Sequence, residues 1–186
     1  MSTVTEGVLT TSAVPPRQLE TLAGVARDAS IANALAAARE LLGMELAYLT
    51  EAEAEAFRFA ALDGDSAPFG GFAPETRIPR EGTLCARMLD GTIGPVVADV
   101  AATPGAADAV NAHGVGTYVG VPVRLGDGTV YGSLCCLSRE PSPGLADRDA
   151  RMLEVIEVAQ IALLHDIGKL ACRTRPCLAH ALRRLT

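Results

Sequence analysis

The clearest pattern of apolar and polar positions lies in residues 117–137. Two runs rich in β-branched and apolar residues, 117–125 and 129–137, flank the dipeptide Asp127-Gly128. This dipeptide tolerates the positive φ angles of a tight type I′ turn. The segment therefore predicts an antiparallel β-hairpin with Asp127 and Gly128 at the centre of its turn.

The two faces of this hairpin differ, because directly opposed residues of an antiparallel pair lie on the same face. With that turn, one face is apolar and pairs Leu125 with Val130, Val123 with Gly132, Val121 with Leu134 and Val119 with Cys136. The other is smaller and more polar and pairs Arg124 with Tyr131, Pro122 with Ser133, Gly120 with Cys135 and Tyr118 with Leu137. Neither pattern is typical of a solvent-facing ribbon. We expect helices on the apolar face and a cavity or covering loops on the mixed face.

The other segments predict helices and short strands around the hairpin. Helical spacing, N-cap residues and glycine stops indicate helices over residues 17–27, 31–42, 83–90 and 104–113, and a long helix from 145 to about 166. Apolar and β-branched runs indicate strands over 44–50, 56–62 and 95–100, and a Pro/Gly-rich loop covers 66–79. The apolar stripe of the long helix is Leu145, Met152, Ile156, Ala159 and Leu163, and Leu153, Ile161 and Leu164 widen this apolar arc. The order of elements predicts an α+β fold.

Composition limits the domain organisation and the partners. The 186 residues suit one domain with helical extensions, so we expect a disordered segment over 1–14, a domain over 15–166 and a basic tail over 167–186. The net charge is −6, and because the tail holds five basic residues and no acidic one, the first 166 residues carry −11. An acidic body argues against nucleic-acid binding.

The chain shows no feature of a membrane or secreted protein. It contains no uncharged apolar run of about 18 residues and no signal sequence, so we expect no membrane partner and a cytoplasmic location. Five cysteines, an odd number without framework spacing, indicate reduced thiols rather than disulfides.

Four motifs resemble those of a GAF domain, and the resemblance covers about residues 19–165. They are Gly-Thr-Leu-Cys-Ala-Arg-Met-Leu from Gly82, Pro-Val-Val-Ala-Asp-Val from Pro95, Tyr-Val-Gly-Val-Pro-Val from Tyr118 and Tyr-Gly-Ser-Leu-Cys-Cys-Leu-Ser from Tyr131. The chain is most similar to the GAF domains that precede EAL-type cyclic-di-GMP phosphodiesterase domains in bacteria. The resemblance implies a central antiparallel sheet with helices on one face and a small-ligand pocket on the other. It also implies dimerisation through the terminal helices.

This resemblance, together with the mixed hairpin face, predicts a sensory or regulatory domain of bacterial signal transduction. Its ligand would be a small molecule and its partners a second copy of the chain and a signalling output protein; the sequence indicates no cofactor. The expected ligand-binding residues, joined by the 66–79 loop, are Cys85, Met88, Tyr118, Gly120, Ser133 and Cys135. Ligand contacts there would shift the helices that flank the sheet.

Two alternative functions stay open at this level. One is a thiol redox enzyme similar to the free methionine sulfoxide reductases, which would require two cysteines within disulfide reach beside the pocket. Cys85, near the start of a short helix, is a candidate for a lowered thiol pKa, although packing also explains it. The other alternative is a dimerisation module with a filled pocket.

No catalytic or metal-binding motif is complete. Adjacent strand residues such as Cys135 and Cys136 point to opposite faces and cannot share one ion. The string from His165 to Lys169 matches the core of HD-type phosphohydrolases but lacks their further ligands. The tail residues Cys172, Cys177 and His180 fit no standard zinc spacing.

Overall fold

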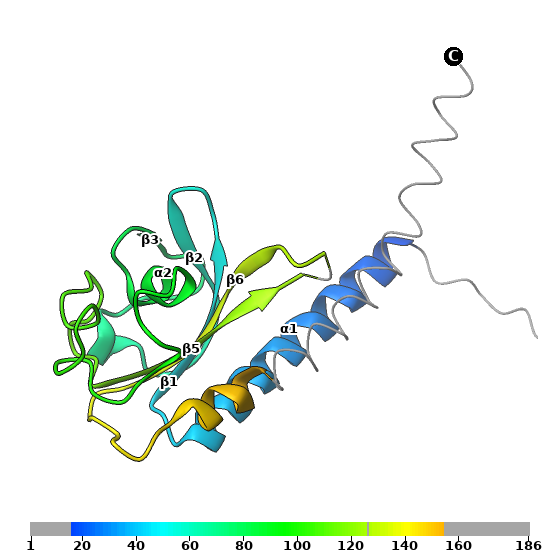
Figure 1. Cartoon of the computed structure of the whole chain (residues 1–186). Coiled ribbons are helices and arrows are strands. Elements are labelled where there is room, and N and C mark those ends of the chain that lie inside the picture. The colour runs from blue at the N-terminus through cyan, green and yellow to red at the C-terminus, as the bar shows by residue number, and fades with distance from the viewer. Residues whose placement is uncertain (1–15, 126, 155–186) are drawn as a thin grey trace, which may run out of the picture.

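The computed structural model describes residues 16–125 and 127–154, and Figure 1 shows their arrangement. An antiparallel sheet of six strands in the order β3-β2-β1-β6-β5-β4 forms the centre. The strands are β1 (Leu46–Ala52), β2 (Ala56–Gly64), β3 (Arg77–Pro79), β4 (Val96–Val97), β5 (Thr117–Arg124) and β6 (Val130–Ser138). The helices are α1 (Pro16–Leu42), α2 (Leu84–Leu89), the single-turn η1 (Ala67–Phe69) and a helix over residues 147–154. The α+β class predicted from the sequence is confirmed.

The predicted hairpin is β5 and β6, and most of its predicted register is confirmed. Opposed residues run from Thr117 with Ser138 to Val123 with Gly132. Both the turn and the strand ends next to it differ from the prediction. A bulge follows Val123, so Arg124 pairs with Val130 and not with Tyr131.

The turn is longer than the predicted two-residue type I′ turn. Leu125 N–H donates to the Thr129 carbonyl at 2.8 Å, so Leu125 does not pair with Val130, and Gly128 N–H donates to the Leu125 carbonyl at 2.8 Å. Gly128 has a φ of +85° and ends the turn rather than lying at its centre. A longer loop that closes with a left-handed glycine is a common alternative when a bulge accompanies the turn.

The helix α1 is continuous, whereas the sequence predicts two helices separated near residues 28–30. That segment contains neither glycine nor proline, so nothing in it interrupts the backbone hydrogen bonds. The predicted start at Pro16 and the predicted stop at Gly43, which has a φ of +61°, are both confirmed.

The 104–113 segment forms consecutive turns, so the predicted helix is wrong. Gly105 has a φ of +79°, outside the helical region. The Arg87 guanidinium donates hydrogen bonds to the Gly105 carbonyl at 2.5 Å and to the Asp108 carbonyl at 3.3 Å. The contacts with Arg87 therefore stabilise the turned conformation of this segment.

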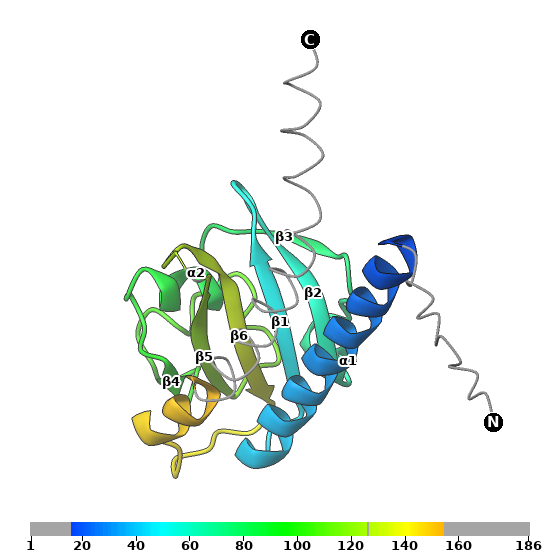
Figure 2. The ribbon, with the colours of Figure 1, turned by 90° about the vertical axis from the view of Figure 1, so that its right-hand side faces the viewer.

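One face of the sheet packs against α1 and the 147–154 helix (Figure 2). Leu35 and Ala38 of α1 and Leu153 of the last helix are fully buried in a core that also contains side chains of β1, β5 and β6. Ala150 and Leu153 point inward, whereas Met152 is 39% exposed. Leu153, predicted to widen the apolar arc, therefore faces the core, whereas Met152, predicted in the stripe itself, lies at its exposed border. The predicted extent of this helix beyond residue 154 lies outside the described residues.

The other face is covered by α2 and by loops, on the side opposite α1 (Figure 1). The predicted N-cap of α2 is confirmed, because Ala86 N–H donates to Thr83 Oγ1 at 3.2 Å. The 66–79 loop contains η1 and the edge strand β3. The predicted 95–100 strand is confirmed only over Val96–Val97.

Both edge strands of the sheet are short and lie beside proline. β3 has three residues and ends at Pro79, and β4 has two residues and follows Pro95. Within the described part of the chain, we find no helix with the length and apolarity needed to span a bilayer.

Candidate functional site

Six buried polar side chains meet on the sheet face under α2, and we call them the thiol–hydroxyl cluster. Alternation along β1, β5 and β6 directs side chains from three neighbouring strands to this face, and α2 places one thiol above them. The cluster consists of Tyr48, Thr50, Cys85, Tyr118, Ser133 and Cys135.

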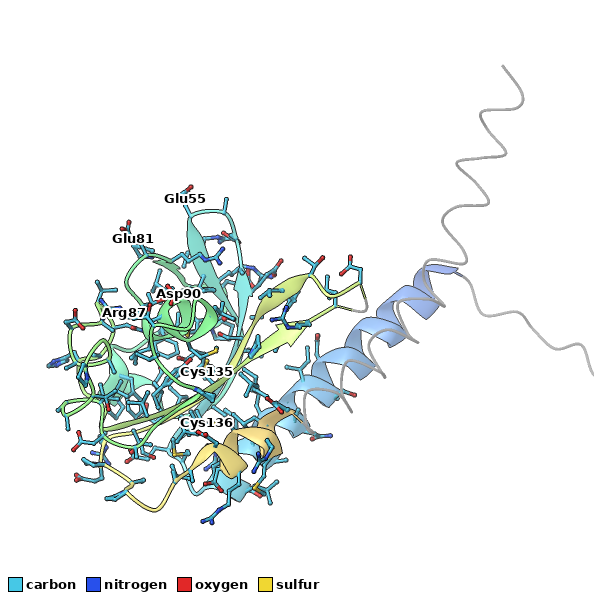
Figure 3. The ribbon with its side chains drawn as sticks, viewed as in Figure 1. Glu55, Glu81, Arg87, Asp90, Cys135 and Cys136 are labelled. Atoms are coloured by element: carbon cyan, nitrogen blue, oxygen red, sulfur yellow. The ribbon has the colours of Figure 1, made fainter. Side chains whose placement is uncertain are left out.

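Two sulfur atoms lie at the centre of the cluster. Cys85 Sγ of α2 lies 3.6 Å from Cys135 Sγ of β6. The Tyr48 hydroxyl lies 3.4 Å from Cys85 Sγ, and the Tyr118 hydroxyl lies 3.3 Å from Cys135 Sγ. Cys136 is on the opposite face, as Figure 3 shows by the positions of Cys135 and Cys136 on either side of the sheet.

A pair of hydroxyl groups extends the cluster toward β1. Cys135 Sγ donates to Ser133 Oγ at 3.3 Å, and Ser133 Oγ lies 2.7 Å from Thr50 Oγ1. Thr50 Oγ1 also accepts the Ser133 backbone N–H at 3.2 Å. These contacts join the side chains of β1 and β6 in addition to their backbone ladder.

The cluster lies within the packed core. Cys85 and Tyr48 are 1% exposed and Tyr118, Ser133 and Cys135 are 0% exposed. Each polar atom has a partner within the cluster, as buried polar groups require. The cluster is thus closed to solvent in this conformation.

Gly120 allows Tyr118 to lie flat along β5. A Cβ at Gly120 would stand 2.1 Å from the Tyr118 hydroxyl oxygen, so any larger residue would collide with the ring. Met88 is 8% exposed and contributes to the apolar wall of the same core. All six sequence-predicted residues therefore lie together on this face, four as members of the cluster and two at its border. Their role in binding a ligand stays a prediction.

The pKa values of the two thiols are shifted in opposite directions. The pKa of Cys85 is lowered to about 7, chiefly because Cys135 donates a hydrogen bond to it, while burial acts in the other direction. Burial raises the pKa of Cys135 well above its ordinary value, and the neighbouring Cys85 adds to this shift. Cys135 has a single proton, which can point to Cys85 Sγ or to Ser133 Oγ. Once Cys85 is a thiolate, its charge favours the first arrangement.

The tyrosines stay protonated beside the sulfurs. Burial raises the pKa of Tyr48 and of Tyr118 well above the ordinary value, and the two thiols add to both shifts. Both hydroxyls can therefore donate to sulfur over the physiological pH range.

Sequence reasoning missed three residues of this region. Tyr48 and Thr50 belong to β1, which pairs with β6 through Tyr48 opposite Cys135 and Thr50 opposite Ser133. The alternation of Leu46, Tyr48 and Thr50 was the available signal, but it does not identify the partner strand. The third residue, Phe72 of the 66–79 loop, stacks on Phe59 at 4.0 Å between ring centroids and meets the Tyr48 ring edge-on at 5.6 Å.

Short contacts clamp α2 onto the 105–111 segment. The Arg87 guanidinium donates to Asp108 Oδ1 at 2.5 Å, and Leu84 N–H donates to Asn111 Oδ1 at 2.8 Å. Gly82 and Gly91, with φ angles of +73° and +82°, lie on either side of α2. Glycine adopts these φ angles without the strain that a larger residue would have, so the two glycines let the chain turn sharply into and out of α2.

The described residues contain no group of three or more His, Cys, Asp or Glu side chains arranged to hold a metal ion. His165, Cys172, Cys177 and His180, whose spacing predicts no complete metal site, lie outside the described residues.

Comparisons with known proteins agree with this fold. The GAF domain family model matches residues 26–163. A cyclic di-GMP phosphodiesterase of Pseudomonas aeruginosa is 34% identical over 92 residues, which make up 48% of this chain and only 16% of that protein.

Two solved structures are similar to this one in fold, although their sequences are distant. A free methionine-R-sulfoxide reductase from Neisseria meningitidis, in complex with its substrate, has a TM-score of 0.59 at 22% identity and covers 88% of this chain and 98% of its own. The blue-light absorbing form of the Thermosynechococcus elongatus PixJ GAF domain has a TM-score of 0.61 at 14% identity and covers 90% of this chain and 98% of its own.

Proposed function

Because the chain belongs to the GAF domain family, we propose that it is a small-molecule-binding sensory domain that regulates an output protein in bacterial signal transduction. The observation that carries this proposal is the polar cluster on one face of a sheet whose other face holds α1. Burying polar groups costs free energy unless each one has a hydrogen-bond partner. Buried polar clusters with perturbed pKa values therefore occur often at functional sites.

The signal would pass through β6. Cys135 lies in the cluster, and Cys136, the next residue, packs in the same core as Leu35 and Ala38 of α1. A ligand that displaces Cys135 must also shift this packed layer, because tightly packed cores transmit small displacements. The helix α1 would carry the change toward the output protein.

A ligand at this site needs space that the described conformation does not provide. The helix α2 covers the two sulfurs, and the half-buried Phe72 packs on Tyr48 at the border of the cluster. We propose that the ligand enters by displacing Phe72. It would be a small molecule with an aromatic or apolar part for Phe59 and Tyr48, and a polar group for Ser133 and Tyr118.

Native mass spectrometry and an absorption spectrum on protein purified from its own host test this proposal. The expected result is additional non-covalent mass, or a thermal shift with members of a small-molecule library, that is lost in Ser133→Ala and Tyr118→Phe. Cys136→Ala, on the opposite face, is the control and should retain the effect. The proposal is contradicted if no ligand is retained and no library member shifts the melting temperature.

A second candidate, a thiol redox enzyme, is favoured by one observation, the 3.6 Å separation of Cys85 Sγ and Cys135 Sγ. The Neisseria meningitidis relative supports it by fold alone. Turnover of free methionine sulfoxide with a thiol reductant would identify this activity, and Cys85→Ser should abolish it.

We further propose a homodimer formed by the terminal helices in the cytoplasm. Val25 and Leu41 of α1 are 63% and 59% exposed, and Met152 of the last helix is also exposed. Apolar side chains on a helix surface favour helix pairing. Light scattering of the full chain should give a dimer mass that falls to the monomer in Leu41→Glu.

A further inference from the structure

We propose that Cys85 and Cys135 form a reversible disulfide when the protein reacts with a small hydroperoxide. The thiol pair is then an oxidation site within the core. It adds a chemical input to the sensory role proposed above, and it rests on that role only for its signalling consequence.

The distance between the two sulfurs is the first argument. Disulfide formation requires the 3.6 Å separation of Cys85 Sγ and Cys135 Sγ to close by about 1.5 Å. The two residues lie on different elements, α2 and β6, and α2 lies between two left-handed glycines, Gly82 and Gly91. We assign this movement to α2, because Cys135 lies in a strand that is paired on both sides.

The surroundings select this pair among the described cysteines. Cys136 is on the opposite face of the sheet and packs against α1, so it cannot reach Cys85. Cys135 is fixed in the central strand between β1 and β5, whereas Cys85 is on the movable element. Cys85 is consequently the thiol that a reagent reaches first when α2 opens.

The acidity of the thiols agrees with this order. The pKa of Cys85 is lowered, chiefly by the hydrogen bond from Cys135, so Cys85 is the better nucleophile near neutral pH. The pKa of Cys135 is raised by burial, so Cys135 keeps the proton that the second step removes.

The reaction has two balanced steps. The Cys85 thiolate attacks the distal oxygen of the hydroperoxide, the O–O bond breaks, and the alkoxide or hydroxide leaves and takes a proton from water, which gives a sulfenic acid. Cys135 then attacks Cys85 Sγ, the S–O bond breaks, and the sulfenic oxygen leaves as water with the Cys135 proton. The two sulfurs together lose two electrons, and the peroxide gains them.

Oxidation changes the partners of three buried hydroxyls. Tyr48 and Tyr118 donate to sulfurs that become weak acceptors in a disulfide, and Ser133 loses the hydrogen bond from Cys135. Buried donors that lose partners raise the energy of the oxidised state, so a dithiol reductant should reverse the bond readily. The change also reaches β6 and, through Cys136, the α1 face.

Peptide mapping of the full chain tests the proposal. The reduced protein is treated with hydrogen peroxide, free thiols are alkylated, and the digest is analysed by mass spectrometry. We expect a cross-linked peptide pair that contains Cys85 and Cys135, lacks two hydrogens and disappears after reduction. Cys85→Ala and Cys135→Ala should remove this pair, and Cys136→Ala, the matched control on the other face, should leave its yield and rate unchanged.

A second variant tests the order of the steps. In Cys135→Ser the sulfenic acid cannot be resolved, so dimedone should label Cys85. The proposal is overturned if peroxide gives sulfinic acid at Cys85 without the cross-link, if both thiols stay unreacted, or if the cross-link joins Cys85 to Cys172 or Cys177 instead. The digest of the wild-type protein alone distinguishes these three outcomes from the expected cross-link.

The result is independent of the ligand experiment. A cross-link without retained ligand supports the oxidation site and not the small-molecule sensor. Retained ligand without a cross-link supports the sensor and not the oxidation site. If the protein reduces methionine sulfoxide catalytically, Cys85 and Cys135 are the thiols of a reductase and not of a peroxide-sensing site.

Discussion

Tyr118 and Gly120 depend on each other, because the tyrosine ring occupies the space next to the glycine Cα. We predict that Gly120→Ala lowers the free energy of unfolding by about 1–3 kcal/mol, since the new methyl group would overlap the Tyr118 hydroxyl, which is 2.1 Å from the Cβ position. Urea unfolding followed by circular dichroism measures the change.

Gly24 provides the matched control for this substitution. It lies within α1 with nothing within 4 Å of its Cβ position, so Gly24→Ala should raise stability by about 0.5–1 kcal/mol. Equal effects of the two alanine substitutions would contradict the steric explanation.

The hydroxyl pair of Thr50 and Ser133 is a separate unit within the cluster. We predict that Thr50→Val and Ser133→Ala each destabilise the protein by about 1–3 kcal/mol, because each leaves a buried partner unsatisfied. The double variant should lose less than the sum, with a coupling of about 0.5–1.5 kcal/mol. A double-mutant cycle in urea measures it, and strict additivity would rule out a direct interaction.

Cys136 makes stability sensitive to alkaline pH. Burial raises the pKa of this thiol from 9.0 to about 12. The folded state holds its proton more tightly than the unfolded chain, so the contribution is complete below pH 9.0 and is lost as the pH rises toward 12.

We therefore predict that Cys136 accounts for about 1 kcal/mol of the stability lost between about pH 8 and about pH 10. Cys136→Ala should flatten the pH dependence by that amount, whatever its effect at neutral pH. Urea unfolding at the two pH values decides this, and parallel curves for the two proteins would count against it.

At the residue level, the sequence predicted a large part of the candidate site. Alternation along the hairpin placed Tyr118, Ser133 and Cys135 on one face and Cys136 on the other. The contact of Cys85 with Cys135 depends on how α2 sits over the sheet, and the roles of Tyr48 and Thr50 depend on the pairing of β1 with β6. Periodicity within one segment carries no information about either arrangement.

At the level of elements, α2 is a six-residue helix whose position depends on the clamp from Arg87. We predict that Arg87→Ala increases the rate of alkylation of Cys85 several-fold, because α2 then opens more often. Timed alkylation with peptide mapping measures this rate.

Arg77→Ala is a suitable control for the clamp. Arg77 forms an exposed ion pair with Glu53, away from α2, and its loss should leave the alkylation rate of Cys85 unchanged. An equal increase in both variants would indicate general loosening rather than release of α2.

One predicted helix and one predicted helix break are wrong, for different reasons. The 104–113 segment has an alanine-rich helical composition, but Arg87, which is distant in sequence, takes up its carbonyl groups. The break predicted in α1 is absent because polar residues alone do not stop a helix. Local propensity is thus decided by tertiary contacts in the first case and by the absence of a breaker in the second.

At the scale of the whole molecule, two apolar cores share the same sheet. We predict that Leu35→Ala on the α1 face and Leu84→Ala on the α2 face each cost about 2–5 kcal/mol and shift one common transition. The chain has no tryptophan, and Tyr48 and Tyr118 lie in the cluster whereas Tyr131 packs on the α1 face. With Tyr131→Phe as the background, tyrosine fluorescence therefore reports on the cluster and far-ultraviolet circular dichroism reports on the helices. Separate transitions for the two signals would show that the cores unfold independently.

The overall architecture was predictable because its strongest signals are local. The hairpin, the N-cap of α2 and the glycine stops specify element types, and the GAF resemblance specifies their order. The exact turn of the hairpin and the orientation of the last helix were not predictable, since a bulge or a one-residue rotation depends on packing against other elements.

The two edges of the sheet determine how other proteins can approach it. A foreign strand adds to a sheet by pairing with a free edge, and the outermost strands here, β3 and β4, have three and two residues and each lies beside a proline. They pair with only three residues of β2 and two residues of β5. Strand addition is therefore disfavoured where β3 and β4 lie, and a foreign strand would have to pair with the remaining parts of β2 or β5.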